Sequence, residues 1–175
     1  MYCSREDTVK EFQKVTSNML KVLVPLSETQ LNYRIKQRWS AGQIGEHIFK
    51  SYASVQTLNG NTKKTVRPID QKLEPIKILF LDTSIKMDSP KAILPSEERI
   101  VKKDLIKGLE ERIEQIKEVI VNSDLSVTCM DYAIPEYGEF TRFEWIWFNI
   151  YHTQRHLHQL ENIIVLNNLK EMKPK

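Results

Sequence analysis

The sequence is poor in cysteine, which forms disulfide cross-links, and in glycine and proline, which interrupt regular secondary structure. Only 2 of its 175 residues are cysteines. These two, Cys3 and Cys129, lie far apart and form no CxxC pair, so we expect no disulfide scaffold and treat Cys129 as an inert thiol. Only 5 glycines and 7 prolines break the chain, and this scarcity favours helices.

Long apolar runs and a strong net charge are also missing. No run approaches the roughly 18 residues of a membrane span, and Met1 to Lys10 has no apolar signal core. We therefore expect a cytoplasmic protein without a membrane partner. The net charge is only +3, with lysines mixed among glutamates along helix-like stretches. This mixing is typical of solvated helix faces, so we expect no nucleic-acid partner.

The length of the chain predicts a single domain over residues 1–175, because typical domains hold about 100–200 residues. A domain of this size buries roughly 70% of its unfolded surface, so neither a metal nor a disulfide is needed merely to fold it.

Apolar residues at three- and four-residue spacing predict four helices. These run from about Asp7 to Val24, from Ser40 to Leu58, from Ser96 to Ile120, and from Thr141 onward. Capping boxes, in which a serine or threonine and a residue three positions later cap each other's backbone, begin at Ser27, Ser40 and Thr141. The stretch 145–151 is almost entirely apolar, which predicts that the last helix is central.

Two segments lack this periodicity. Residues 61–95 hold Pro68, Pro75, Pro90 and Pro95, which exclude one long helix, and a connection of this length is often a lid or a pocket wall. Its apolar run 76–81 fits a buried strand, a short helix or an ordered crossover. Residues 123–140 read as a second loop.

The stretch 151–160 carries the strongest chemical signal. His152 and His156 are four residues apart on the last predicted helix, so their side chains share one face at about 5–6 Å between Cβ atoms. That spacing lets two imidazoles converge on one metal ion. His158 falls about 160° around the axis from His152 and should not join them.

A third ligand is available in His47, which lies on the inward stripe of the second predicted helix. Three imidazoles with one open position describe a catalytic rather than a structural zinc site. Nickel, iron or manganese would also accept such ligands. The competing interpretation is that all three are hydrogen-bonded core histidines.

Three blocks of sequence resemble the DinB/YfiT-like family of four-helix bundles. The first block is 26–33 followed by 39–47, which ends at His47. The second is 81–86 with Ser89-Pro90 and 94–96. The third runs from Pro135 through His152 and includes Arg155 to Leu160. The block from Trp39 to His47 and the block around His152 and His156 are specific as a pair. Together the three blocks span most of the chain.

The resemblance implies an all-α four-helix bundle of the DinB-like type, with a long crossover between helices 2 and 3. It also implies one divalent metal ion (Zn, Ni, Fe or Mn) held by residues that match His47, His152 and His156. Many relatives carry a histidine before the proline that matches Pro135, where this chain has Ile134. Relatives often form homodimers.

The family resemblance further implies a metal-dependent hydrolase or a transferase that uses a low-molecular-weight thiol, acting on a small-molecule substrate. Asn149, Arg155 and Gln159 are the candidate supporting or pocket residues. Glu46 precedes a ligand but projects about 100° away from it, so we do not expect it to be a base. The sequence identifies no catalytic residue.

Two other functions stay open. The bundle could be a non-enzymatic binding or stress-response protein whose metal is structural or vestigial. A weaker alternative places haem between His47 and a histidine of the last helix. For a metal site, the ordinary pKa of histidine predicts binding that weakens between about pH 7.5 and pH 5.

Overall fold

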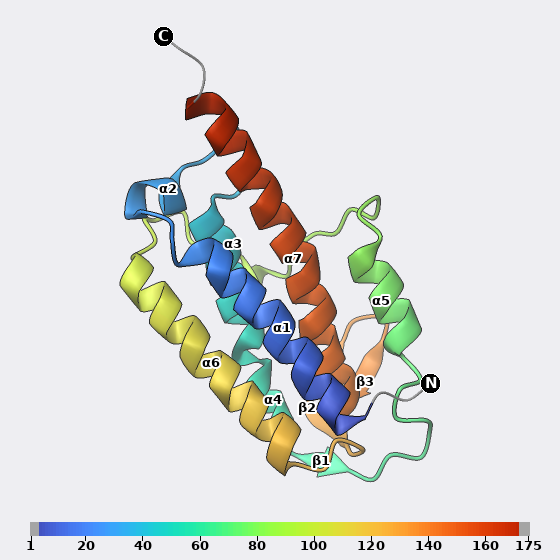
Figure 1. Ribbon diagram of the computed structural model, residues 1–175. Helices are drawn as coiled ribbons and strands as arrows, with labels where there is room; N and C mark the ends of the chain where they lie inside the picture. The colour runs from blue at the N-terminus through green and yellow to red at the C-terminus, as the bar shows by residue number, and fades with distance from the viewer. Residues whose placement is uncertain (1–3, 172–175) are drawn as a thin grey trace.

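The computed structural model describes residues 4–171, and the side chains of residues 4–165. It is mainly helical and carries a small three-stranded sheet (Figure 1). The longer helices are α1 (Arg5–Leu23), α3 (Ala41–Ser51), α5 (Leu73–Leu81), α6 (Lys102–Asn122) and α7 (Arg142–Glu171). The shorter elements are α2 (Glu28–Asn32), η1 (Tyr52–Ser54), α4 (Val55–Leu58), β1 (Thr62–Lys63), η2 (Lys91–Ile93), β2 (Thr128–Ile134) and β3 (Gly138–Thr141).

Helix α1 begins two residues earlier than predicted. Ser4 accepts a hydrogen bond from the backbone N–H of Asp7, whose carboxylate accepts from Ser4 in return. This capping box starts the helix at Arg5, and the chain turns away before Pro25. The predicted boxes at Ser27 and Ser40 are confirmed at the starts of α2 and α3.

Helix α3 packs on α6 through Gly45. A Cβ at this position would lie 2.9 Å from the end of the Leu105 side chain, so a larger residue would have to displace that side chain. The second predicted helix is correct to Leu58, but it is interrupted by the 3₁₀ turn η1 before α4.

The predicted start of the third helix at Ser96 is wrong, because α6 begins at Lys102. The backbone of Ser96 is committed elsewhere: its N–H donates to Glu46 and its carbonyl accepts from Gln43. The Ser96 hydroxyl caps only a local turn, accepting from the N–H of Glu98.

The three-stranded sheet was not predicted, and most of it occupies the segment that we interpreted as a loop. Strand β2 pairs with β1 on one side and with β3 on the other, antiparallel in both cases. Glu136 and Gly138 take positive φ angles of 69° and 71° in the β2–β3 turn. The open question over residues 76–81 is settled, since they form most of α5.

Helix α7 is central, as predicted. It packs against α1 and α3, and α5 lies along another side of it (Figure 1). Nearly every side chain from Phe143 to Thr153 is buried. Helix α6 packs on α1 and α3 rather than on α7.

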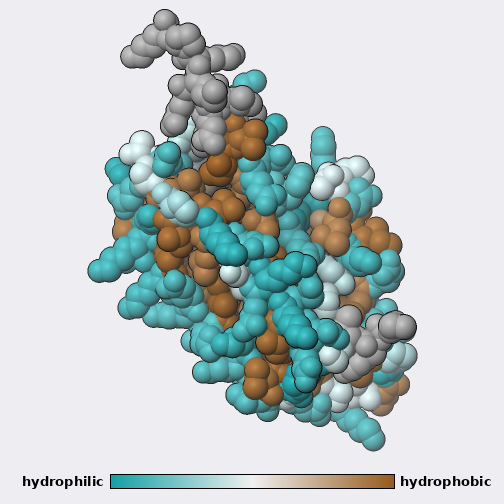
Figure 2. Space-filling model, in the orientation of Figure 1, coloured by the Kyte–Doolittle hydropathy of each residue, from teal (hydrophilic) through white to brown (hydrophobic). Residues whose placement is uncertain are grey.

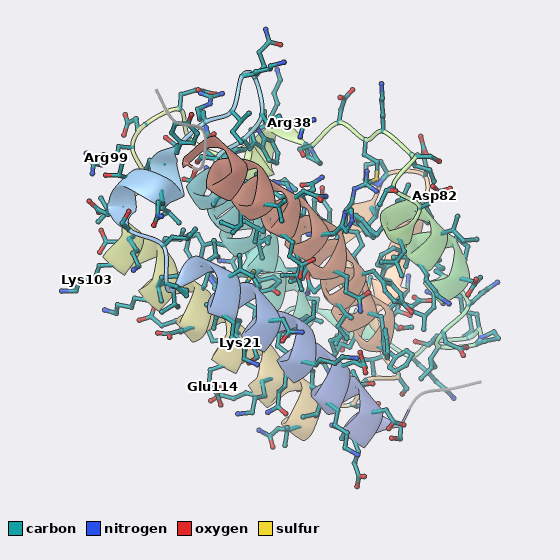
Figure 3. All side chains as sticks on the ribbon, turned by 45° about the horizontal axis from the view of Figure 1, so that its top comes forward. Lys21, Arg38, Asp82, Arg99, Lys103 and Glu114 are labelled. Carbon is teal, nitrogen blue, oxygen red and sulfur yellow. The ribbon has the colours of Figure 1, made fainter. Side chains whose placement is uncertain are left out.

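Charged side chains cover the outside of the helices. Hydrophilic residues dominate the face shown in Figure 2, with hydrophobic patches between them. Figure 3 shows Lys21 and Glu114 pointing outward from α1 and α6. Among the described residues, no helix has both the length and the apolar character that crossing a membrane requires.

Candidate metal centre

Three buried histidines meet between α3 and α7. His47 comes from α3, whereas His152 and His156 lie one turn apart on α7. One ring nitrogen of each lies within 4.8 Å of the others. The Nε2 atom of His152 is 3.0 Å from Nε2 of His47 and 2.9 Å from Nε2 of His156.

The outer nitrogen of His47 fixes the state of its ring. Nδ1 lies 2.7 Å from the carbonyl oxygen of Ile93. A carbonyl can only accept, so Nδ1 carries the proton and Nε2 presents a lone pair to the cluster. The rings of Trp39 and His47 lie 5.0 Å apart, which limits rotation of the imidazole further.

The rings on α7 are oriented in the same way. Nδ1 of His156 lies 2.8 Å from Oε1 of Gln159, an amide oxygen that accepts, so its Nε2 also presents a lone pair. Nδ1 of His152 lies 3.2 Å from the hydroxyl of Ser51. Each imidazole thus has a polar partner on its outer side and its Nε2 on the inner side.

This arrangement fits a metal ion. The Nε2 lone pairs of His47 and His156 face Nε2 of His152 at 3.0 and 2.9 Å. Such lone pairs repel unless a proton or a cation lies among the three nitrogens. The cluster itself can supply at most one proton, on His152. Tetrahedral zinc at about 2.0–2.1 Å from each nitrogen would set them roughly 3.3 Å apart. The Nε2 atom of His152 would need to move only a few tenths of an ångström away from each of the other two.

Burial keeps these imidazoles neutral. Desolvation lowers the pKa of His47, even though its bond to Ile93 opposes the shift. Desolvation, followed by the neighbouring histidines, lowers the pKa of His152 well below 6.5. The pKa of His156 falls to about 3, again mainly through desolvation. The predicted weakening of metal binding between about pH 7.5 and pH 5 assumed ordinary values, and these shifts move it to lower pH.

The cluster opens into a cleft of about 1340 Å³. Helices α3 and α7 form two of its walls, with Phe80 of α5, the η2 segment and the end of β2 completing it. The crossover between α4 and α6 therefore supplies a wall, as predicted for a connection of this length.

The candidate supporting residues have different roles. Gln159 contacts a histidine directly. Arg155 lines the cleft, but its guanidinium donates to the carbonyls of Phe80, Asp82 and Ile85, so it holds the end of α5. The Asn149 side chain bonds to Ser54 rather than to a histidine and does not line the cleft.

His158 lies outside the cluster, as predicted, and the Glu46 carboxylate has other partners. His158 is exposed and pairs with Asn162, outside the cluster. Glu46 forms an ion pair with Lys50 and accepts from the N–H of Ser96.

Sequence reasoning missed Ser51 and the Ile93 carbonyl. Ser51 carried a readable signal, since it lies one turn after His47 on the same stripe of α3. The Ile93 carbonyl carried none, because a backbone group bears no residue signature and the 82–99 segment has no periodic pattern.

Residues 11–160 match the family model described as the DinB superfamily. The search of curated proteins and the search of solved structures each gave no significant match.

Proposed function

The chain belongs to the DinB superfamily, and from this membership and the histidine cluster we propose that it is a divalent-metal-dependent enzyme acting on a small molecule. His47, His152 and His156 are its ligands, and the metal is zinc, nickel, iron or manganese. We also propose that α1, α3 with its continuation α4, α6 and α7 are the four bundle helices, with the crossover between α4 and α6.

The observation that carries this proposal is the convergence of three Nε2 atoms at the wall of a large cleft. Three imidazoles leave a coordination position free for a further ligand. A divalent ion bound there lowers the pKa of a coordinated water or thiol and so provides a nucleophile near neutral pH.

The chain's own residues orient the ligands and shape the site. Gln159 accepts a hydrogen bond from Nδ1–H of His156, and the Ile93 carbonyl accepts one from Nδ1–H of His47. Both Nε2 atoms are therefore free to coordinate. Arg155 holds the end of α5, and thereby Phe80, against the cleft.

We favour thiol transfer over hydrolysis. Among the residues that line the cleft, the carboxylates are Asp88 and Glu136, and both are exposed. None of the hydrogen bonds recorded for the three imidazoles involves a carboxylate. Metal-dependent hydrolases commonly add a carboxylate general base to the metal-bound water, whereas a metal-bound thiol reacts directly as its thiolate. The cleft also exceeds the roughly 300–1,000 Å³ of ordinary ligand pockets, which leaves room for two reactants.

Metal content by elemental analysis of untagged protein tests the site. We expect about one ion per chain, lost in His47→Ala and in His152→Ala. His158→Ala is the matched control, because it removes an imidazole from the same helix outside the cluster, and it should keep its ion. Equal losses in all three variants, or no metal after incubation with zinc, nickel and manganese, would contradict the proposed centre.

Loaded protein then separates the activities. Consumption of an electrophilic substrate that requires an added low-molecular-weight thiol supports transfer. Turnover without thiol would indicate hydrolysis. A bound metal with neither activity would favour the non-enzymatic bundle.

A further inference from the structure

The cleft extends well beyond the metal centre. Its wall on α7 runs from Trp145 to Ile163, which at about 1.5 Å per residue is roughly 27 Å of helix. His152 and His156 lie near the middle of that length. The cleft therefore continues past the histidines for about 10 Å in each direction.

The two ends of the cleft differ in chemistry. Beyond His156 it is lined mainly by polar residues around Trp39, namely Gln37, Arg38, Gln159 and Asn162. Beyond His152, the side chains at its wall are mostly apolar or aromatic. We call this second end the aromatic arm and define it by Tyr132, Ile134, Tyr137, Trp145 and Phe148.

Rings in the arm form a chain that leads to the metal centre. Phe148 stacks on His152 with ring centroids 5.8 Å apart and an interplanar angle of 29°. Trp145 lies 5.4 Å from Phe148, and Tyr132 lies 6.1 Å from Trp145.

Tyr132 is the exposed member of this chain. Its side chain is 48% exposed although it contacts Trp145 and lines the cleft, so a ligand could cover it. Trp145 is held differently: its indole N–H is buried and has no hydrogen-bond acceptor among the described residues. The rings of Phe140 and Phe148 pack against Trp145 and hold it in the wall of the arm.

We propose that the aromatic arm is a substrate subsite that binds an aromatic ring, placing a metal-binding group of the same molecule at the three histidines. This inference rests on the proposed function for the metal-binding group, but the ring-binding part depends only on the walls of the arm. It predicts that the unidentified substrate carries an aromatic ring and is not purely aliphatic or sugar-like.

A pair of hydroxamates tests the subsite on zinc-loaded protein. Both compounds chelate the metal, and only one carries a ring. We expect 2-naphthylacetohydroxamate to bind at least about tenfold more tightly than acetohydroxamate by calorimetry, because the ring buries apolar area against other rings. Equal affinities would overturn the proposal.

Substitutions locate the binding. Tyr132→Ala should weaken the naphthyl compound about fivefold, the usual scale of one lost ring contact, and leave acetohydroxamate unchanged. Met130→Ala is the matched control, since Met130 is on the same strand and 47% exposed but does not line the cleft. If both variants weaken the naphthyl compound equally, the ring does not bind in the arm.

Metal-free protein separates failure of this inference from failure of the proposed function. The probe here is 2-naphthylacetate, followed by saturation-transfer NMR. If the chain proves to bind no metal, ring binding that is sensitive to Tyr132→Ala still supports the arm. If the chain binds metal but 2-naphthylacetate binding is absent or insensitive to Tyr132→Ala, the metal centre stands and the aromatic subsite is wrong.

Discussion

Helix α7 carries two buried polar clusters that are built in opposite ways. At its first turn the carboxylate of Glu144, fully buried, accepts from both Nη atoms of Arg67 and from the backbone N–H groups of Lys72 and Thr141. Two to three turns later the histidine cluster directs its three Nε2 atoms only at one another.

The difference separates a structural cluster from a binding site. Glu144 has its charge balanced and both of its oxygens bonded by protein groups, so nothing further is needed there. The imidazoles have partners on their outer nitrogens and unmatched lone pairs on their inner ones, an arrangement that a cation completes. Disrupting the two clusters should therefore affect different properties of the protein.

The largest effect on stability is expected at Glu144. Glu144→Ala leaves Arg67 without its partner and uncaps α7, so the free energy of unfolding should fall by about 3–5 kcal/mol, as when a buried pair loses one member. Urea denaturation measures this loss. The matched control, Glu114→Ala, removes an exposed carboxylate paired with Lys117 and should cost less than about 1 kcal/mol. Equal losses would mean that the Glu144 cluster does not stabilise the fold.

A smaller effect, on metal affinity rather than on folding, is expected at Gln159. Gln159→Leu removes the acceptor that orients His156, and loss of such a partner typically weakens metal binding about 10–100-fold. Gln159→Glu keeps an acceptor and should restore most of the affinity, which a purely steric role would not predict. Gln154→Leu, on the same helix but outside the cleft, is the control. Competition with a chelating dye measures all three affinities, and unchanged binding in Gln159→Leu would remove Gln159 from the site.

The same contrast shows how far the sequence could lead. The Thr141 capping box was readable, and it is confirmed in the bonds between Thr141 and Glu144. The sequence could not reveal that Arg67, from the distant crossover, uses the same carboxylate. The three histidines were readable because two share a helix face and the third lies on an inward stripe, so local periodicity was sufficient.

The errors arose where long-range contacts override local patterns. Ser96 has the residue type of a helix cap, but its backbone bonds to α3 delay α6 until Lys102. Strand β1 has only two residues and lies more than sixty residues before its partner β2. Pairing across such a separation leaves no periodic signal along the chain.

The smallest expected effect is the dependence of unfolding free energy on pH. Measuring it tests whether burial keeps the imidazoles of the cluster neutral. Burial lowers the pKa of His156 to about 3 in the folded chain, against 6.5 for the ordinary side chain. Between these values the unfolded chain binds a proton that the folded one does not. The stabilising contribution of the neutral ring is thus complete above pH 6.5 and is lost as pH falls toward the folded value.

Each histidine of this kind should make metal-free protein lose about 1.4 kcal/mol of unfolding free energy per pH unit below its unfolded pKa. Urea titrations between about pH 6.5 and 5.5 measure the slope above the range where most carboxylates titrate. The His156→Gln variant keeps a polar side chain that cannot titrate. Its unfolding free energy should therefore fall less steeply with decreasing pH, by the equivalent of one proton. If His156→Gln leaves the slope unchanged, burial does not lower the pKa of His156, and the folded chain does not hold this ring neutral below pH 6.5.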